Sequence, residues 1–96
     1  MSSYIRVEWM HSLPDEPRWL YSELDGERWE VRKVEQFPDG RMAFADAGAS
    51  SGDTRLGDVQ VPTLAEIGAI PEFRPIEITK AEFEAIWQRA TRPPLR

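Results

Sequence analysis

Cysteine is absent from this 96-residue sequence, and histidine occurs only once, as His11. Without thiols, the chain cannot form disulfides, use a cysteine nucleophile or bind zinc or an iron–sulfur cluster through sulfur. A single imidazole also excludes a metal site built from several histidines. No segment approaches the roughly 20 apolar residues that a membrane-spanning helix needs, and we find no apolar core of a secretory signal. We therefore expect a cytoplasmic protein that uses no metal or other cofactor.

Positive charge is also scarce. The chain holds 12 Lys and Arg against 17 Asp and Glu, which gives a formal net charge of −5 at pH 7. An acidic surface repels phosphate, so binding to nucleic acid or to anionic membranes is disfavoured. With 41% hydrophobic and 30% charged residues, the composition is typical of a soluble globular protein. The length suits a single domain over residues 1–96.

Hydrophobic alternation predicts strands in the first half of the sequence. Residues 4–10 place Ile, Val and Trp on one face and charged residues on the other, which is typical of a half-buried strand. Two further candidates follow at 18–24 and 28–37. The alternation shifts within the second, so either a bulge near Arg32 and Lys33 redirects the strand or both faces of the sheet are partly covered. The Pro-Asp-Gly-Arg turn at 38–41 predicts a hairpin into a fourth strand. We therefore expect a four-stranded antiparallel meander over residues 4–47.

The second half predicts a loop and two helices. Residues 48–58 contain three glycines and several small polar residues, which indicates a flexible loop. Thr63 and Thr79 are each followed three residues later by a glutamate, the spacing of a capping box. These caps predict a short helix at about 63–69 and a longer C-terminal helix at about 80–91.

The predicted fold class is α+β. We expect an antiparallel sheet of four to five strands, a long C-terminal helix packed on one face and one short helix before it. A fifth strand could come from Val59 and Val61 or from residues 74–78. Pro75 restricts the second candidate to an edge strand or an extended link, because proline cannot donate a hydrogen bond to a central ladder.

Part of the sequence is similar to a known family. The resemblance is carried by the segments Tyr4-Ile5-Arg6-Val7, Trp9, His11-Ser12, Pro14-Asp15-Glu16-Pro17, Leu20-Tyr21-Ser22-Glu23-Leu24-Asp25, Arg28, Glu30-Val31-Arg32-Lys33-Val34-Glu35, Phe37 and Asp39-Gly40-Arg41. Together they resemble a family of small uncharacterised bacterial, actinobacterial-type domains of unknown function. The resemblance spans most of residues 4–90 and implies a self-contained domain. It implies no catalytic residue, cofactor or substrate.

Candidate chemistry gathers around His11. Ser12 and two carboxylates follow it closely, but a catalytic triad is defined by geometry, and adjacent strand residues point to opposite faces. We expect a hydrogen-bonded histidine at a strand end. Glu23 and Glu30 alternate with arginine and lysine, a pattern typical of cross-strand ion pairs on a solvated face. The alternative is an acid–base pocket between sheet and helix that contains His11, Glu23 and Glu30.

Four tryptophans are unusual in so short a chain. Three of them lie in apolar patterns and are expected in the core: Trp9, Trp29 and Trp87. The fourth, Trp19, alternates with Leu20, so two arrangements remain open. Either Leu20 faces the core and Trp19 and Tyr21 are exposed, or the two aromatic side chains are buried and Leu20 is exposed.

These patterns favour protein–protein recognition without catalysis. Trp, Tyr and Arg are the residue types that dominate binding energy at interfaces. We expect a recognition surface on the sheet face opposite the C-terminal helix, next to the 48–57 loop, formed by Arg18, Trp19, Tyr21 and Glu23. An immunity- or antitoxin-like protein that covers a basic partner is one concrete version, and self-association is another. The alternative function is a small-molecule-binding domain or minor enzyme that uses the His11 pocket.

Overall fold

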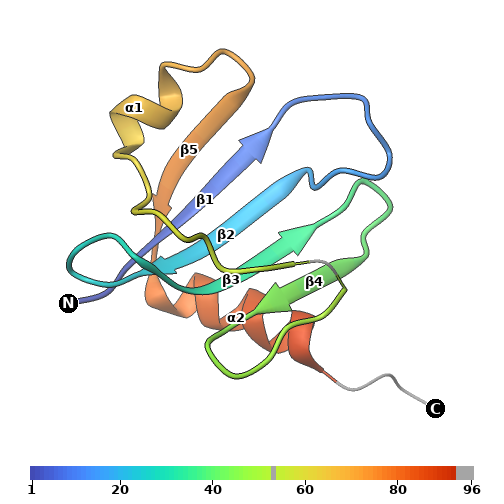
Figure 1. The fold of residues 1–96 in the computed structure, drawn as a ribbon. Helices are drawn as coiled ribbons and strands as arrows, with labels where there is room; N and C mark the ends of the chain where they lie inside the picture. Colours follow the sequence, from blue (N-terminus) through green and yellow to red (C-terminus); the bar gives the residue numbers. More distant parts are fainter. Residues whose placement is uncertain (53, 93–96) are drawn as a thin grey trace.

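A computed structural model describes residues 1–52 and 54–92 of the chain. Its centre is a five-stranded antiparallel sheet with the strand order β4-β3-β2-β1-β5 (Figure 1). This arrangement confirms the predicted α+β fold. In chain order the elements are β1 Ser3–Trp9, β2 Trp19–Leu24, β3 Glu30–Gln36, β4 Met42–Ala45, α1 Leu64–Gly68, β5 Phe73–Ile78 and α2 Lys80–Thr91.

Short local signals set the turns of the meander. Gly40 has φ +93°, a conformation that glycine adopts without strain, and its N–H donates to the Phe37 carbonyl at 2.9 Å. Between β2 and β3, the Asp25 carboxylate accepts hydrogen bonds from the backbone N–H groups of Glu27 and Trp29, each at 2.9 Å. An aspartate that binds the backbone two residues ahead favours a turn.

Of the two explanations for the shifted alternation in the third strand, the structure shows a bulge, next to the expected position at Arg32 and Lys33. Glu23 pairs with Arg32 and Leu24 pairs with Glu30, so Val31 is the extra residue. At the bulge the Val31 residue is 40% exposed to solvent, and Trp29, two residues earlier, is 41% exposed. The prediction that Trp29 lies in the core is therefore wrong, because it precedes the bulge and the first residue of β3 rather than lying within a regular ladder.

The edge strand β5 pairs with β1, so that Tyr4 lies opposite Ile78 and Val7 lies opposite Pro75. Pro75 is therefore on the outermost strand, where a residue without an N–H group is tolerated. The fifth strand comes from this segment. Val59 and Val61 form no strand, and the Val61 N–H instead donates to the Arg28 carbonyl at 2.8 Å.

Both faces of the sheet carry a hydrophobic cluster. On one face, Phe83 of α2 packs against Tyr4 and Ile78, and Tyr21 joins them. On the other face, α1 closes a second cluster, which comprises Ile5, Val7, Leu24 and Ile67, with Leu20 packed against it. The two alternatives for β2 were therefore not exclusive: Leu20 and Tyr21 pack on opposite faces, because each face has its own cover.

The helices begin where the capping boxes predict. In each, the threonine hydroxyl accepts from the backbone N–H of the glutamate three residues ahead, and the glutamate carboxylate accepts from the threonine N–H. In α2, Phe83 is fully buried and Ile86 is 8% exposed, whereas Trp87 is half-buried. Trp87 packs edge-on against Phe44 of β4, with the ring centroids 5.5 Å apart.

The glycine-rich segment 48–58 forms no helix or named strand in its described part, apart from an isolated bridge between Ala45 and Ser50. Hydrogen bonds nevertheless fasten it to the sheet. The Thr54 hydroxyl donates to Glu35 at 2.8 Å, the Lys33 ammonium donates to the Arg55 carbonyl at 2.7 Å, and the Gly57 N–H donates to Glu30 at 2.8 Å. These three contacts join the described part of the segment to side chains of β3.

Candidate functional site

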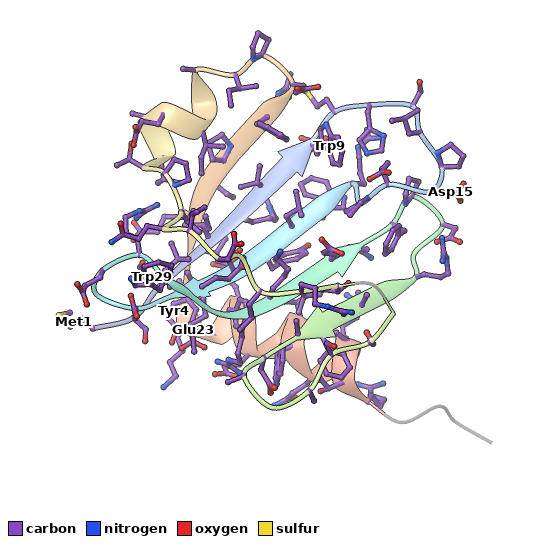
Figure 2. The ribbon with its side chains drawn as sticks, in the orientation of Figure 1. Met1, Tyr4, Trp9, Asp15, Glu23 and Trp29 are labelled. Atoms are coloured by element: carbon purple, nitrogen blue, oxygen red, sulfur yellow. The ribbon has the colours of Figure 1, made fainter. Side chains whose placement is uncertain are left out.

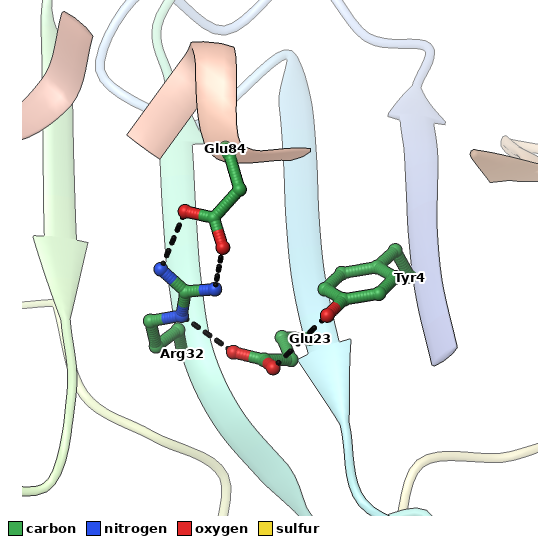
Figure 3. A network of polar contacts seen from close by, with 4 residues as sticks. All are labelled: Tyr4, Glu23, Arg32 and Glu84. Carbon is green, nitrogen blue, oxygen red and sulfur yellow. Dashed lines mark hydrogen bonds and ion pairs between the residues drawn. The ribbon is translucent and has the colours of Figure 1, made fainter. Parts of the chain in front are cut away.

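A polar network connects α2 to the sheet (Figure 3); it is buried at Tyr4 and Glu23 and partly exposed at Glu84. Arg32 of β3 donates two hydrogen bonds to the Glu84 carboxylate, at 3.0 and 2.7 Å. Its Nε donates to Glu23 of β2, and the Tyr4 hydroxyl donates to the other Glu23 oxygen at 3.3 Å. Glu23 is only 9% exposed, so its charge is compensated inside the protein rather than by water.

Charge and packing reinforce each other in this network. The Arg32 guanidinium lies over the rings of Phe83 and Trp87, 4.9 and 5.1 Å from their centroids. Its hydrogen bonds to Glu84 hold the pKa of that carboxyl below its usual value. Both carboxylates are occupied by one guanidinium, so the network positions α2 on the sheet and offers no free acid or base.

Beyond α2, no other helix of the described residues covers this face of the sheet, because α1 packs on the opposite face. Cross-strand pairing places Trp19 opposite Glu8 and Tyr21 opposite Arg6. Directly opposed residues in an antiparallel pair share a face, and Tyr21 packs with the α2 cluster. Figure 1 shows α2 crossing this face near the end at which β1 begins and β2 ends. The row that contains Trp19 lies towards the other end.

Strand β5 completes this open region. Arg74 lies opposite Glu8, and Ile76 lies opposite Arg6. Ile76 is 43% exposed, Arg74 is exposed and Trp19 is half-buried. We call this region the Trp19 surface, and it consists of Arg6, Glu8, Trp19, Tyr21, Arg74 and Ile76.

An arginine stacks on the central tryptophan. The guanidinium carbon of Arg6 lies 5.0 Å from the centroid of the Trp19 ring, within the range of a cation–π contact. The Arg18 guanidinium reaches Glu8, with 3.7 Å between Nε and the carboxylate oxygen, and donates to the His11 carbonyl at 3.4 Å. Trp19 is therefore held in place by its neighbours while part of it stays in contact with solvent.

A cleft of about 290 Å³ borders the Trp19 surface where the sheet meets α2. Its lining residues come from β1, β2, β5 and the near side of α2: Arg6, Tyr21, Ile78, Glu82, Ala85, Ile86 and Arg89. Burial raises the pKa of the Tyr21 hydroxyl, and the positive charges of Arg6 and Arg89 act in the opposite direction. Arg6 and Arg89 thus line the cleft together with Tyr21 and the carboxylate of Glu82.

The residues of the alternative pocket do not meet. Leu13 N–H donates to Nδ1 of His11 at 2.9 Å, so the proton lies on Nε2, which donates to the Pro17 carbonyl at 2.7 Å. Figure 2 shows Trp9 at the far end of β1 from Tyr4 and Glu23, and His11 follows Trp9 by two residues. Glu30 accepts from the Ser22 hydroxyl at 2.8 Å, on the face opposite Glu23. The three residues therefore form no acid–base site.

A second, larger cavity lies at the edge of the sheet beside β3 and β4. Its volume is about 670 Å³, and three carboxylates line it, from Asp15, Glu16 and Glu35. Glu35 is already hydrogen-bonded to Thr54. Among the described residues, no group of three or more His, Cys, Asp or Glu side chains is arranged to hold a metal ion.

Comparison with known proteins identifies the family. Residues 3–92 match the family described as a domain of unknown function, DUF6881. The chain belongs to the DUF6881 family. This match confirms the resemblance to a small domain of unknown function. No curated protein and no solved structure matches the chain. In the described part of this DUF6881 domain, no helix has the length and apolar character needed to cross a membrane.

The DUF6881 structure separates the four residues of the predicted recognition surface. Trp19 and Tyr21 share a face, but it is the face that α2 partly covers, so their predicted position opposite the helix is wrong. Glu23 lies beneath α2 in the polar network and is not part of an exposed surface. Arg18 reaches the Trp19 surface through its ion pair with Glu8.

Three arginines of this region are not recognisable as site residues from the sequence. Arg6, Arg74 and Arg89 come from β1, β5 and α2, and nothing in their local sequence relates them to Trp19. The register of the β1–β2 and β1–β5 pairs brings the first two together with it. The alternation in residues 4–10 shows that Arg6 lies on the face opposite Ile5 and Val7. It does not show which residues of other strands share that face, because this depends on the pairing of β1.

Proposed function

We propose that this DUF6881 chain is a non-enzymatic recognition domain that binds a protein partner through the Trp19 surface. The observation that carries the proposal is the position of Trp19 itself. It lies on the open part of a sheet face, it is only half-buried, and Arg6 stacks on its ring. Exposed tryptophan and arginine side chains held by their neighbours are typical of residues that dominate binding at interfaces.

The fixed position of these side chains supports the proposal. Strands β1, β2 and β5 fix the backbone, and the Arg6–Trp19 contact restricts both side chains before any partner arrives. Binding then costs less side-chain entropy than it would from a mobile loop. Ile76 adds exposed apolar area beside the aromatic ring. A rigid, partly apolar patch bordered by charges has the composition of an interface centre and its rim.

An immunity- or antitoxin-like inhibitor remains the more specific form of this proposal. In that form the partner is basic, since the chain carries a net charge of −5 and complementary charge accelerates encounter. The acidic groups that favour such a partner include Asp15, Glu16 and Glu35 around the larger cavity, away from the Trp19 surface. We propose a cytoplasmic setting, because a domain without cysteine gains nothing from an oxidising compartment.

A peptide-display selection tests the proposal. A library of random peptides is selected on the full-length chain, and the enriched peptides are then measured against Trp19→Ala and Trp29→Ala. Trp29 is the matched control, since it is 41% exposed but lies outside the Trp19 surface. We expect the enriched peptides to bind Trp19→Ala at least about tenfold more weakly than wild type, the effect of losing about 1.4 kcal/mol. Binding to Trp29→Ala should match wild type.

The opposite pattern would refute the proposal. Peptides that bind Trp19→Ala as well as wild type would remove Trp19 from the recognition surface. Sedimentation of the wild-type chain over a range of concentrations tests whether a second copy is the partner, and Trp19→Ala should abolish any dimer that uses this surface. Circular dichroism of each variant shows whether a loss of binding reflects loss of folding.

A further inference from the structure

We infer that the segment of the partner that docks on the Trp19 surface is acidic and places a carboxylate in the cleft between Arg6 and Arg89. This inference rests on the proposed function and adds the chemistry of the partner. It differs from the basic partner that the net charge alone suggests. The charge that a bound segment meets is the local one at the contact, not the average over the chain.

The arginines of this region have few internal partners. Among the described residues, Arg18, Arg32 and Arg41 each form an ion pair with a carboxylate within 4 Å. Arg6, Arg74 and Arg89 form no such pair with the residues that the structure describes. All three line or border one region, which spans the Trp19 surface and the adjoining cleft. An arginine without an internal carboxylate can still form a bidentate pair with one from a partner.

The carboxylates of this region are already engaged. Glu82 lines the cleft, but its side chain accepts a hydrogen bond from the Thr79 N–H at 2.9 Å as part of the helix cap. Glu8 lies beside Arg18, at 3.7 Å. Arg18, outside the region, offsets the charge of Glu8, so that Glu82 alone stands against Arg6, Arg74 and Arg89. The region therefore keeps a positive excess on an acidic protein.

The cleft has the size and lining for one acidic side chain. Its volume of about 290 Å³ is at the lower end of small-ligand pockets and suits a side chain rather than a separate metabolite. Ile78, Ala85 and Ile86 supply apolar walls, and the Tyr21 ring forms part of the lining. An aspartate or glutamate of the partner would place its methylene groups against these walls and its carboxylate between the two guanidinium groups. Apolar neighbours in the same segment would cover Trp19 and Ile76.

A protein carboxylate fits this region better than the phosphates of a nucleic acid. A nucleic acid presents a long line of negative charge, which this chain, at an overall net charge of −5, would repel. A short acidic segment meets only the arginines that surround Trp19. Its attraction is therefore not opposed by the carboxylates on the other face of the sheet.

Fluorescence anisotropy with defined probes tests this inference. The probes are three fluorescein-labelled oligomers of 12 units: a peptide that alternates glutamate with leucine, the same peptide with lysine in place of glutamate, and oligo-dT. We expect the full-length chain to bind the acidic peptide and not the other two. Arg6→Gln and Arg89→Gln should each weaken binding by about tenfold, as expected for the loss of one charge-assisted hydrogen bond. Arg55→Gln removes an exposed arginine outside the region and should have no effect.

Each other outcome overturns the inference. Failure to bind the acidic peptide, or equal binding by the Arg6, Arg89 and Arg55 variants, would exclude a carboxylate in the cleft. If the lysine peptide binds and Trp19→Ala abolishes that binding, the inference of an acidic partner segment is wrong, whereas the proposed recognition function stands. Binding of oligo-dT would identify the region as a nucleic-acid surface and contradict both proposals. Because the display selection makes no assumption about charge, it decides the proposed function independently.

Discussion

Arg32 of β3 and Glu84 of α2 are joined by two parallel hydrogen bonds of 3.0 and 2.7 Å. This bidentate pair fixes where α2 lies along the sheet. The position of α2 in turn decides which part of the face is covered and which part, around Trp19, stays open. The pair is therefore a structural determinant of the proposed binding surface, although it is not part of that surface.

Replacing Arg32 should destabilise the fold. Arg32→Ala leaves the buried Glu23 carboxylate without its cation, and loss of one partner from a buried ion pair is strongly unfavourable. We expect a loss of about 2–3 kcal/mol in the free energy of unfolding, measured by urea denaturation. This loss is smaller than for a fully buried ion pair, because the side chains of Arg32 and Glu84 are partly exposed. Arg41→Ala is the control, since its ion pair with Asp39 is exposed, and its urea midpoint should stay at the wild-type value. Similar urea midpoints for Arg32→Ala and Arg41→Ala would show that the ion pairs of Arg32 with Glu23 and Glu84 do not stabilise the fold.

The stability should depend on pH through Glu84. Its pKa in the folded chain lies below the ordinary value of 4.5 because Arg32 stabilises the carboxylate. The stabilisation is therefore complete above about pH 4.5 and is lost as the pH falls through the lower, folded-state pKa. Glu84→Gln should be less stable than wild type at pH 7, and the difference between the two should shrink in acid. A difference that stays constant from pH 7 to pH 3 would contradict this assignment.

The cap of α2 should contribute measurably to stability. The Thr79 hydroxyl accepts a hydrogen bond from the Glu82 N–H at 3.1 Å, and Thr79→Ala removes it. We expect a loss of about 1 kcal/mol in thermal or urea denaturation. Thr79→Ser keeps the hydroxyl and should retain most of the wild-type stability. Equal losses in the two variants would show that the hydroxyl does not act as the cap.

Trp87 and Trp29 differ in packing, so truncating each to alanine should change the free energy of unfolding by different amounts. Trp87 packs against Phe44 and Phe83 and lies beneath Arg32, so Trp87→Ala should cost about 3 kcal/mol. Trp29 is 41% exposed, and Trp29→Ala should cost about 1 kcal/mol or less. Chemical denaturation of both variants measures the contrast, and a larger loss at Trp29 would contradict the described packing.

Much of the fold follows from local sequence signals. The alternation around Val7 predicts β1, the Asp39-Gly40 turn predicts the β3–β4 hairpin, and the two threonine caps predict the starts of both helices. These signals are informative because the chemistry acts within a few residues: a side chain binds a nearby N–H, or glycine adopts a positive φ. The bulge at Val31 is also visible as a break in alternation.

The burial of individual side chains depends on how the strands pair, and local sequence signals do not predict that pairing. Alternation shows that Leu20 and Tyr21 point to opposite faces, but not that both faces are covered. The exposure of Trp29 depends on a bulge whose exact position the sequence leaves open. Glu23 has the pattern of a solvated charge, and only the register that brings Arg32 opposite it, together with α2 above, explains its burial.

An amide ¹H–¹⁵N NMR titration of the full-length chain with a peptide from the display selection locates the binding surface directly. We predict that the largest shift changes lie at Arg6, Trp19, Tyr21 and Ile76 and include the Trp19 indole N–H. Shift changes that gather instead around Trp29, or around the cavity lined by Asp15, Glu16 and Glu35, with the Trp19 indole unchanged, would contradict this prediction.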